Sequence, residues 1–196
     1  MQIIVDFGLD VQQYHALVMT LGVRGLVIEA QFLWCPFCKG KKKKHRLWRH
    51  GSYERFVVVA ELDVAITILV VRLYCCKKGQ TVSLLPHFLA PRKQHTWEVM
   101  GTYFSKIEIE GCSRVAAMEA ATKIKPSRQK GAYWSRCLEE NLVQIQTYLS
   151  GIRPRLAGAP CPSTLLKALR RGYKTLGEAL ARHNLMMHKM HGVWLL

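Results

Sequence analysis

Two pairs of cysteines are the residues whose types and spacing point most clearly to chemistry. Cys35 and Cys38 are separated by two residues, and Gly40 follows shortly afterwards. Two thiolates three positions apart on a tight turn can bind one tetrahedral zinc ion, and the glycine relieves the backbone beyond them. Cys75 and Cys76 form the second pair, at the end of a β-branched segment. The sequence therefore predicts a zinc site with candidate ligands Cys35, Cys38, Cys75 and Cys76.

The second pair fits a zinc site less well than the first. Cys75 and Cys76 are adjacent, and neighbouring side chains of a strand point to opposite faces. The position three residues after Cys75, where a ribbon would place its fourth cysteine, holds Lys78. Three interpretations stay open: a fourth ligand from His87 or His50, a weak three-coordinate site, or a ribbon held by packing without metal. A redox role is less favoured, because no βαβ pattern surrounds the first pair.

The elements that must position these cysteines can be predicted from hydrophobic patterns. Residues 55–59 and 64–74 are rich in Val, Ile and Thr around a turn-like 61–63, which predicts an antiparallel hairpin. A helix is expected at 11–20. Residues 83–91 contain two prolines and are interpreted as an extended linker.

The second half of the chain has helical periodicity. Helices are predicted from about residue 96, at 113–121 and at 127–149, and Ser163 is expected to cap a last helix. The predicted fold class is α+β: a small zinc-ribbon-like antiparallel β module, a helix-turn-helix-like region and a C-terminal helix. The expected boundaries are an N-terminal segment at 1–30, the β module at 31–95, the helix-turn-helix-like region at 96–150, a linker at 151–162 and a basic helical tail at 163–196.

The net charge of the chain indicates which class of partner it binds. It has 196 residues with 29 Lys+Arg against 13 Asp+Glu, giving a net charge of +16 and a pI near 9.8. Its hydrophobic fraction of 49% excludes wholesale disorder. A globular protein this basic usually binds a polyanion. Most of the excess lies in 39–55 and 151–196, with +7 in each.

Two basic stretches are the candidate nucleic-acid contacts. The first follows the Cys35–Cys38 pair, and the second begins a predicted helix after a short helix with small residues, an order found in helix-turn-helix units. Such side chains bind phosphates, and those at the start of a recognition helix can also reach base edges. The candidates are Lys41, Lys42, Lys43, Lys44, Arg46 and Arg49 in the first stretch, and Lys125, Arg128, Gln129 and Lys130 in the second.

Several of these motifs together resemble a known family. The order of 34–40, 49–55, 71–75 and 79–92 is similar to bacterial and mobile-element proteins with an uncharacterised, transposase-like zinc-ribbon domain, as in the N-terminal heads of insertion-sequence transposases. The match covers roughly residues 30–105. The resemblance implies a ribbon that binds zinc and helps to grip DNA, with three ligand positions at Cys35, Cys38 and Cys75. The chain departs from the pattern at Lys78.

No catalytic motif stands out. A two-metal nuclease needs three carboxylates that converge on the cations. The only aspartates, Asp6, Asp10 and Asp63, all lie before or inside the predicted β module, and no later region has the strands to hold such a site. We therefore expect a cytoplasmic, non-catalytic protein that binds duplex DNA and spans no membrane. The alternatives left open are an accessory subunit that binds a transposase or another protein, an RNA-binding module, in which aromatics such as Trp34 and Trp48 stack on bases, and a remnant transposase.

Overall fold

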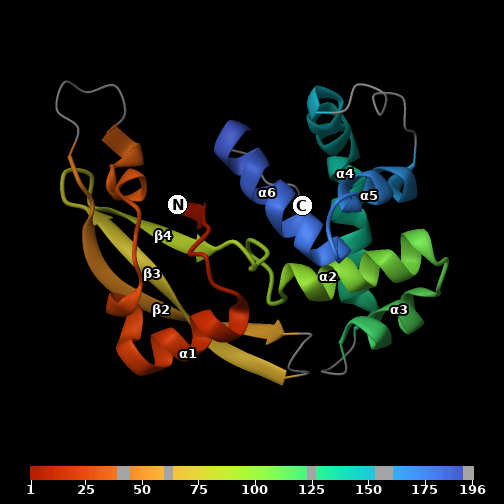
Figure 1. Ribbon diagram of the computed structural model, residues 1–196, viewed down its shortest axis with the longest axis horizontal. Coiled ribbons are helices and arrows are strands. Elements are labelled where there is room, and N and C mark those ends of the chain that lie inside the picture. Colours follow the sequence, from red (N-terminus) through yellow and green to blue (C-terminus); the bar gives the residue numbers. More distant parts are fainter. Residues whose placement is uncertain (39–44, 60–63, 123–126, 153–160, 192–196) are drawn as a thin grey trace. The chain divides into compact units, whose positions relative to one another are not determined.

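The computed structural model describes residues 1–38, 45–59, 64–122, 127–152 and 161–191 (Figure 1). The chain divides into two compact units: unit 1 contains Met1–Phe56 and Thr67–His87, and unit 2 contains Val57–Ile66 and Phe88–Leu196. Six α-helices and a four-stranded sheet confirm the expected α+β class. These units divide the chain at other places than the boundaries expected from the sequence.

The strands occur in the first half of the chain and the main helices in the second. The strands are β1 (Gln2–Val5), β2 (Trp48–Val59), β3 (Val64–Cys75) and β4 (Gln80–Pro86). The α-helices are α1 (Val11–Leu21), α2 (Trp97–Phe104), α3 (Arg114–Ala121), α4 (Arg128–Ile152), α5 (Pro162–Arg170) and α6 (Leu176–His191). Short helical turns are η1 (Gly22–Gly25), η2 (Ala30–Leu33), η3 (Pro36–Cys38) and the π-turn η4 (Ser105–Ile109).

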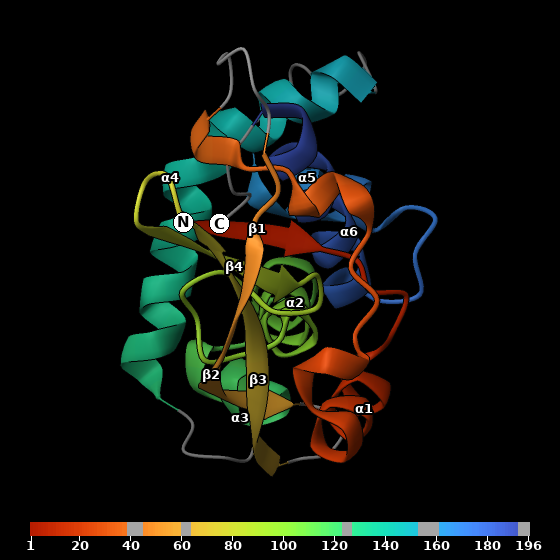
Figure 2. The ribbon, with the colours of Figure 1, turned by 90° about the vertical axis from the view of Figure 1, so that its left-hand side faces the viewer.

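The sheet is mixed, with the strand order β1-β4-β3-β2. Figure 2 shows the short β1 next to β4. β1 pairs in parallel with β4, Ile4 opposite Leu85, and β3 pairs antiparallel with β4, Val71 opposite Leu84. The neighbouring β2 and β3 confirm the predicted hairpin, and both strands extend further than expected. The segment interpreted as a linker forms most of β4. Its first proline, Pro86, is the last strand residue, where a missing N–H is tolerated.

The alternation of β3 and β4 decides which cysteine is buried. Val71, Leu73 and Cys75 are buried on one face of β3, whereas the side chains between them are half-buried. The buried partners Leu84 and Val82 lie opposite the first two. Because consecutive strand residues point to opposite faces, the face that carries the apolar core of unit 1 also receives the Cys75 thiol.

Helix α1 packs on the sheet of unit 1. Its N-terminus is fixed by a capping box in which Asp10 accepts from the N–H of Gln13 and the side chain of Gln13 accepts from the N–H of Asp10. The buried Tyr14 donates its hydroxyl to the carbonyl of Leu69 on β3, at 2.9 Å. Burial raises the pKa of the Tyr14 hydroxyl, which therefore stays a neutral donor.

Unit 2 is a helical assembly around a continuous apolar core. Trp97, Tyr103 and Phe104 of α2 belong to it and are fully buried. α2 and α6 cross closely at two glycines, because a Cβ added to Gly101 would strike the backbone of Gly177. No helix within the described residues is both long and apolar enough to cross a membrane.

The C-terminal region differs from its expected form. The predicted last helix is two helices, α5 and α6, interrupted near Gly172, which has a positive φ of 95°. This conformation ends helices and favours glycine. Cys161, and not Ser163, occupies the N-cap of α5, with Pro162 in the first helical position.

Candidate metal centre

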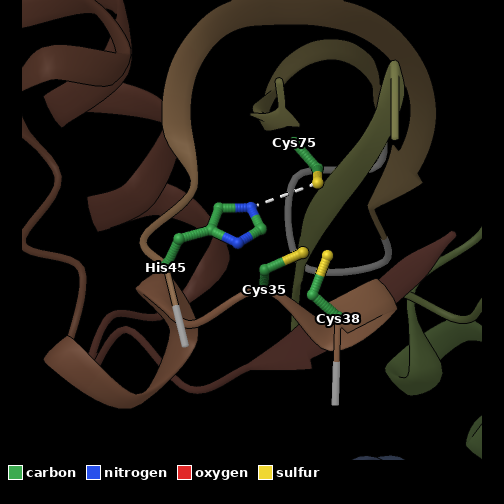
Figure 3. A group of neighbouring side chains, drawn as sticks. All are labelled: Cys35, Cys38, His45 and Cys75. Carbon is green, nitrogen blue, oxygen red and sulfur yellow. Dashed lines mark hydrogen bonds between the residues drawn. The ribbon is translucent and has the colours of Figure 1, made fainter. Parts of the chain in front are cut away.

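Four side chains of unit 1 gather into a group with the chemistry of a zinc site. They are Cys35, Cys38, His45 and Cys75, and one ligand atom of each lies within 4.8 Å of all the others (Figure 3). The three cysteines are buried and the histidine is half-buried. Within the described residues, no other set of three or more such side chains meets this criterion.

The first two ligands are brought together by a short turn. η3 spans Pro36–Cys38, so the chain reverses within the Cys35–Cys38 segment and both thiols face the same point. Proline starts such a turn readily, because its φ is already fixed near the helical value. The predicted geometry of this pair is therefore present.

A two-stranded bridge positions the histidine. Trp34 pairs antiparallel with Arg46, through backbone hydrogen bonds from Cys35 to His45 (3.1 Å) and from Leu47 to Leu33 (2.6 Å). Residues next to a bridged pair point to the opposite side from it. Cys35 and His45 therefore lie on the side away from Trp34 and Arg46, where they meet the thiol of Cys75.

The last ligand lies at the end of β3, where a turn begins. The carbonyl of Cys75 accepts from the N–H groups of Lys78 (3.2 Å) and Gly79 (2.9 Å), and Gly79 has a positive φ of 63°. These two N–H groups help to hold the residue in place. A backbone of this kind favours glycine, since a Cβ would strain it.

The donor set fits a structural zinc ion. Zinc is typically bound by four tetrahedral ligands, with Zn–S distances of about 2.3 Å, so its sulfur ligands lie roughly 3.7 Å apart. A group within 4.8 Å needs only a small contraction to reach that geometry. The Nε2 of His45 is 3.2 Å from the Sγ of Cys75, and its Nδ1 is buried without a hydrogen-bond partner among the described residues. A buried ring nitrogen of this kind is well suited to bind a metal.

The thiols of the metal-free group differ in acidity. Burial, together with a hydrogen bond to Cys75, raises the pKa of Cys35 to about 11. Burial also acts to raise the pKa of Cys75, but hydrogen bonds from Cys35 and from the N–H of Lys78 outweigh it and lower that pKa. Cys75 is therefore the thiol that ionises more readily. A divalent cation favours the thiolate form of every cysteine that binds it.

The structure places the other predicted ligands elsewhere. Cys76 is exposed in the turn that follows β3 and lies outside the group. Lys78 is exposed in the turn. His50 stacks on Tyr74 at a centroid distance of 5.1 Å, and the Nδ1 of His87 lies 3.2 Å from the Asp6 carboxylate.

The predicted nucleic-acid-binding residues of the first stretch differ in exposure and in the contacts that they make. Lys41, Lys42, Lys43 and Lys44 lie outside the described residues. Arg46 is exposed, with its guanidinium 5.7 Å from the ring centroid of Trp34. Arg49 donates to the carbonyls of Val23 (3.0 Å) and Leu26 (2.9 Å), and so joins β2 to the preceding segment.

The second stretch starts a long helix, as predicted. Arg128, Gln129 and Lys130 are exposed in the first turn of α4, where the hydroxyl of Ser127 accepts from the N–H of Lys130 at 3.3 Å. Lys125 lies outside the described residues. The two basic stretches belong to different units.

Comparison with known proteins adds no further constraint. No protein-family model, curated protein or solved structure matches the chain. The centre is therefore interpreted from its own residues.

Proposed function

We propose that this chain is a zinc-stabilised, non-catalytic protein that binds duplex DNA, of the transposase-related kind that its sequence resembles. One observation carries the proposal: two neighbouring members of the cluster, Cys38 and His45, bracket the lysine run in the sequence. A bound metal would fix both ends of the segment that carries Lys41, Lys42, Lys43 and Lys44.

The ligand count supports a structural role for the metal. Catalytic zinc sites typically use three protein ligands and keep one position for water or substrate, whereas structural sites are closed by four. Cys35, Cys38, His45 and Cys75 supply four. Zinc would cross-link the segment before β2 to the end of β3, and no reaction step needs to be assigned to it.

The charge supports DNA as the partner. The chain carries a net charge of +16, and the strongest local concentration of lysine lies between two members of the cluster. Each phosphate contact releases bound counterions, so the logarithm of the affinity falls linearly with the logarithm of the salt concentration. Lysines 41–44 and Arg46 would provide such contacts without reading the sequence.

We propose that α3 and α4 provide sequence preference as a helix-turn-helix-like pair. Ser113 caps α3 by accepting from the N–H of Ala116, and α3 contacts α4 within unit 2. The exposed Arg128, Gln129 and Lys130 lie at the N-terminus of α4. In helix-turn-helix proteins this end of the second helix contacts base edges.

A salt series with charge-matched variants tests the phosphate contacts. The double variant Lys41→Gln/Lys42→Gln should weaken binding to every duplex and reduce the salt slope by about 1.8, for two lost contacts. The control Lys167→Gln/Arg170→Gln removes the same charge from exposed positions of α5. Equal effects of both variants, or no duplex binding by the unaltered chain, would contradict the proposal.

A second pair of variants tests the recognition helix. Gln129→Ala should change which duplex is preferred in a competition between sequences, since a lost base contact costs about 1–3 kcal/mol at one position. Glu140→Gln is the control, because Glu140 is exposed on the same helix, eleven positions further along. An unchanged preference with Gln129→Ala would remove α4 from this role.

A further inference from the structure

The outer side of the bridge that holds the zinc ligands carries exposed aromatic rings. Trp34 is 44% exposed and Trp48 is 69% exposed. Tryptophan is highly buried on average in folded proteins. For comparison, Trp97 and Trp134 of unit 2 are 1% and 2% exposed. Two exposed tryptophans 14 positions apart in the sequence need a reason to remain in water.

The strand alternation explains why these rings face outward. Trp34 and Arg46 form the bridged pair, so their side chains lie on the same side. Their neighbours Cys35 and His45 point to the other side, into the metal group. Trp48 follows Arg46 by two residues, and therefore lies on the same side as Arg46 if the chain stays extended, as its strand assignment indicates.

A cation lies against one of the two rings. The Arg46 guanidinium sits 5.7 Å from the centroid of the Trp34 ring, within the range of a cation–π contact. Arg46 is itself exposed. The surface therefore combines two flat apolar rings with a positive charge, and two of its residues, Arg46 and Trp48, belong to the basic stretch 39–55 of the sequence.

We propose that Trp34, Arg46 and Trp48 form a stacking surface for unpaired DNA bases. Proteins that bind single strands combine a positive surface, which follows the phosphates, with aromatic side chains on which bases stack. Base edges are paired inside a duplex and the base faces are stacked, so these rings need a frayed end or single-stranded segment. The inference rests on the proposed DNA-binding function and specifies its substrate: duplex DNA with an unpaired extension.

Metal and stacking surface are coupled by the same bridge. Cys35 and His45 hold its inner side, while Trp34 and Arg46 lie on its outer side. Loss of the metal frees the two strands of the bridge, and the relative placement of Trp34 and Arg46 is then no longer fixed. Chelation should therefore weaken binding of the extension as well as binding of the duplex.

The test compares a blunt duplex, the same duplex with a single-stranded oligothymidine extension, and a free oligouridine of equal length, by fluorescence anisotropy. The unaltered chain should bind the extended duplex more tightly. Trp34→Ala/Trp48→Ala should lose that advantage, by roughly 5- to 150-fold for each stacked base. Trp34→Phe/Trp48→Phe should retain much of it. Phe56→Ala is the matched control, because Phe56 is 52% exposed near the other end of β2.

Zinc content is measured for every variant, so that a folding defect is not mistaken for a lost contact. The inference is overturned if the double alanine variant binds the extended duplex as tightly as the unaltered chain does, or if Phe56→Ala has the same effect. Tighter binding of the oligouridine than of the extended duplex would assign the surface to RNA and also overturn it. If the blunt duplex does not bind but the extension binds through the tryptophans, the duplex proposal fails and this one stands.

Discussion

The segment before β2 and the helical unit 2 are ordered in different ways. Within unit 1, the helical elements in the described parts of 22–47 (residues 22–38 and 45–47) are turns of three or four residues, and few side chains there are buried. Unit 2 has five α-helices around a continuous apolar cluster. Apolar burial orders the second region. In the first, the four candidate metal ligands would supply cross-links that side-chain packing does not, and would hold the exposed Trp34, Arg46 and Trp48 in place.

The largest expected difference between the two regions is their response to chelation. Structural zinc contributes apparent free energies of about 10–16 kcal/mol in zinc-finger peptides. Removing it should therefore abolish protection from hydrogen exchange at 30–38 and 45–47, while the helices of unit 2 keep theirs. Exchange measured by mass spectrometry, with and without a chelator, checks this. Equal loss of protection in both regions would contradict the claim that the metal orders only the first of them.

A glycine substitution in unit 2 should destabilise that unit and leave the candidate metal centre unchanged, the opposite of the effect expected from chelation. Gly101→Ala places a Cβ against the backbone of Gly177, where α2 crosses α6. Overpacking typically costs 1–3 kcal/mol, and more where only backbone could move. Urea unfolding should show unit 2 destabilised with the zinc content unchanged.

The control for that substitution is a glycine in open space. A Cβ at Gly151, in α4, meets nothing within 4 Å. Gly151→Ala should therefore leave stability unchanged or raise it by up to about 1 kcal/mol, because alanine favours the helix. A loss with Gly151→Ala as large as that with Gly101→Ala would contradict the close crossing.

Substitutions at the helix caps should have smaller effects on stability. In each unit, a side-chain oxygen at the start of a helix accepts a hydrogen bond from a backbone N–H. Asp10 caps α1 in unit 1, and Thr96 caps α2 in unit 2 by accepting from the N–H of Val99 at 3.4 Å. Asp10→Ala and Thr96→Ala should each cost about 1 kcal/mol of unfolding free energy, because an N–H at the helix start loses its acceptor. Asp10→Asn keeps an acceptor and should cost little. Equal losses with Asn and Ala at this position would rule out the cap as the cause.

The smallest expected effect concerns thiol reactivity. Hydrogen bonds from the hydroxyls of Ser163 and Thr164 lower the pKa of Cys161 to about 7, below the ordinary value of a thiol. The thiolate is the reactive form, and its fraction rises as pH passes the pKa. In zinc-loaded protein, where the metal would hold Cys35, Cys38 and Cys75, iodoacetamide should therefore alkylate Cys161 first, with a rate midpoint near pH 7. Ser163→Ala should move this midpoint upward, and an unchanged midpoint would contradict the assignment.

The parts of the candidate metal centre that depend on short-range sequence patterns could be predicted, and the part that depends on pairing between separate segments could not. The Cys35–Cys38 turn and the hairpin leading to Cys75 follow local rules of spacing and β-branching, and both are present. His45 was missed because no short motif marks it: the bridge between Trp34 and Arg46 brings it into the group of candidate ligands. One signal was available. If Trp34 is expected to pair with Arg46, then their neighbours Cys35 and His45 must lie on the same side of the bridge.

Other differences have similar causes. β4 pairs with β1, whose residues lie about 80 positions earlier, and such long-range pairing leaves no local trace. The stripe of leucines after residue 163 continues across two helices, so periodicity alone could not reveal the break near Gly172. Cys76 was included as half of an adjacent pair, although β3 ends at Cys75 and Cys76 begins the exposed turn that follows.

Zinc content is the measurement that tests the account most directly. The purified chain and its Cys76→Ser variant should each contain one zinc ion per molecule, measured by native mass spectrometry. Zinc should be lost or strongly weakened in His45→Ala and Cys75→Ser, because each removes one of the four ligands. Zinc retained in His45→Ala but lost in Cys76→Ser, or no zinc in the unaltered chain, would contradict the centre described here.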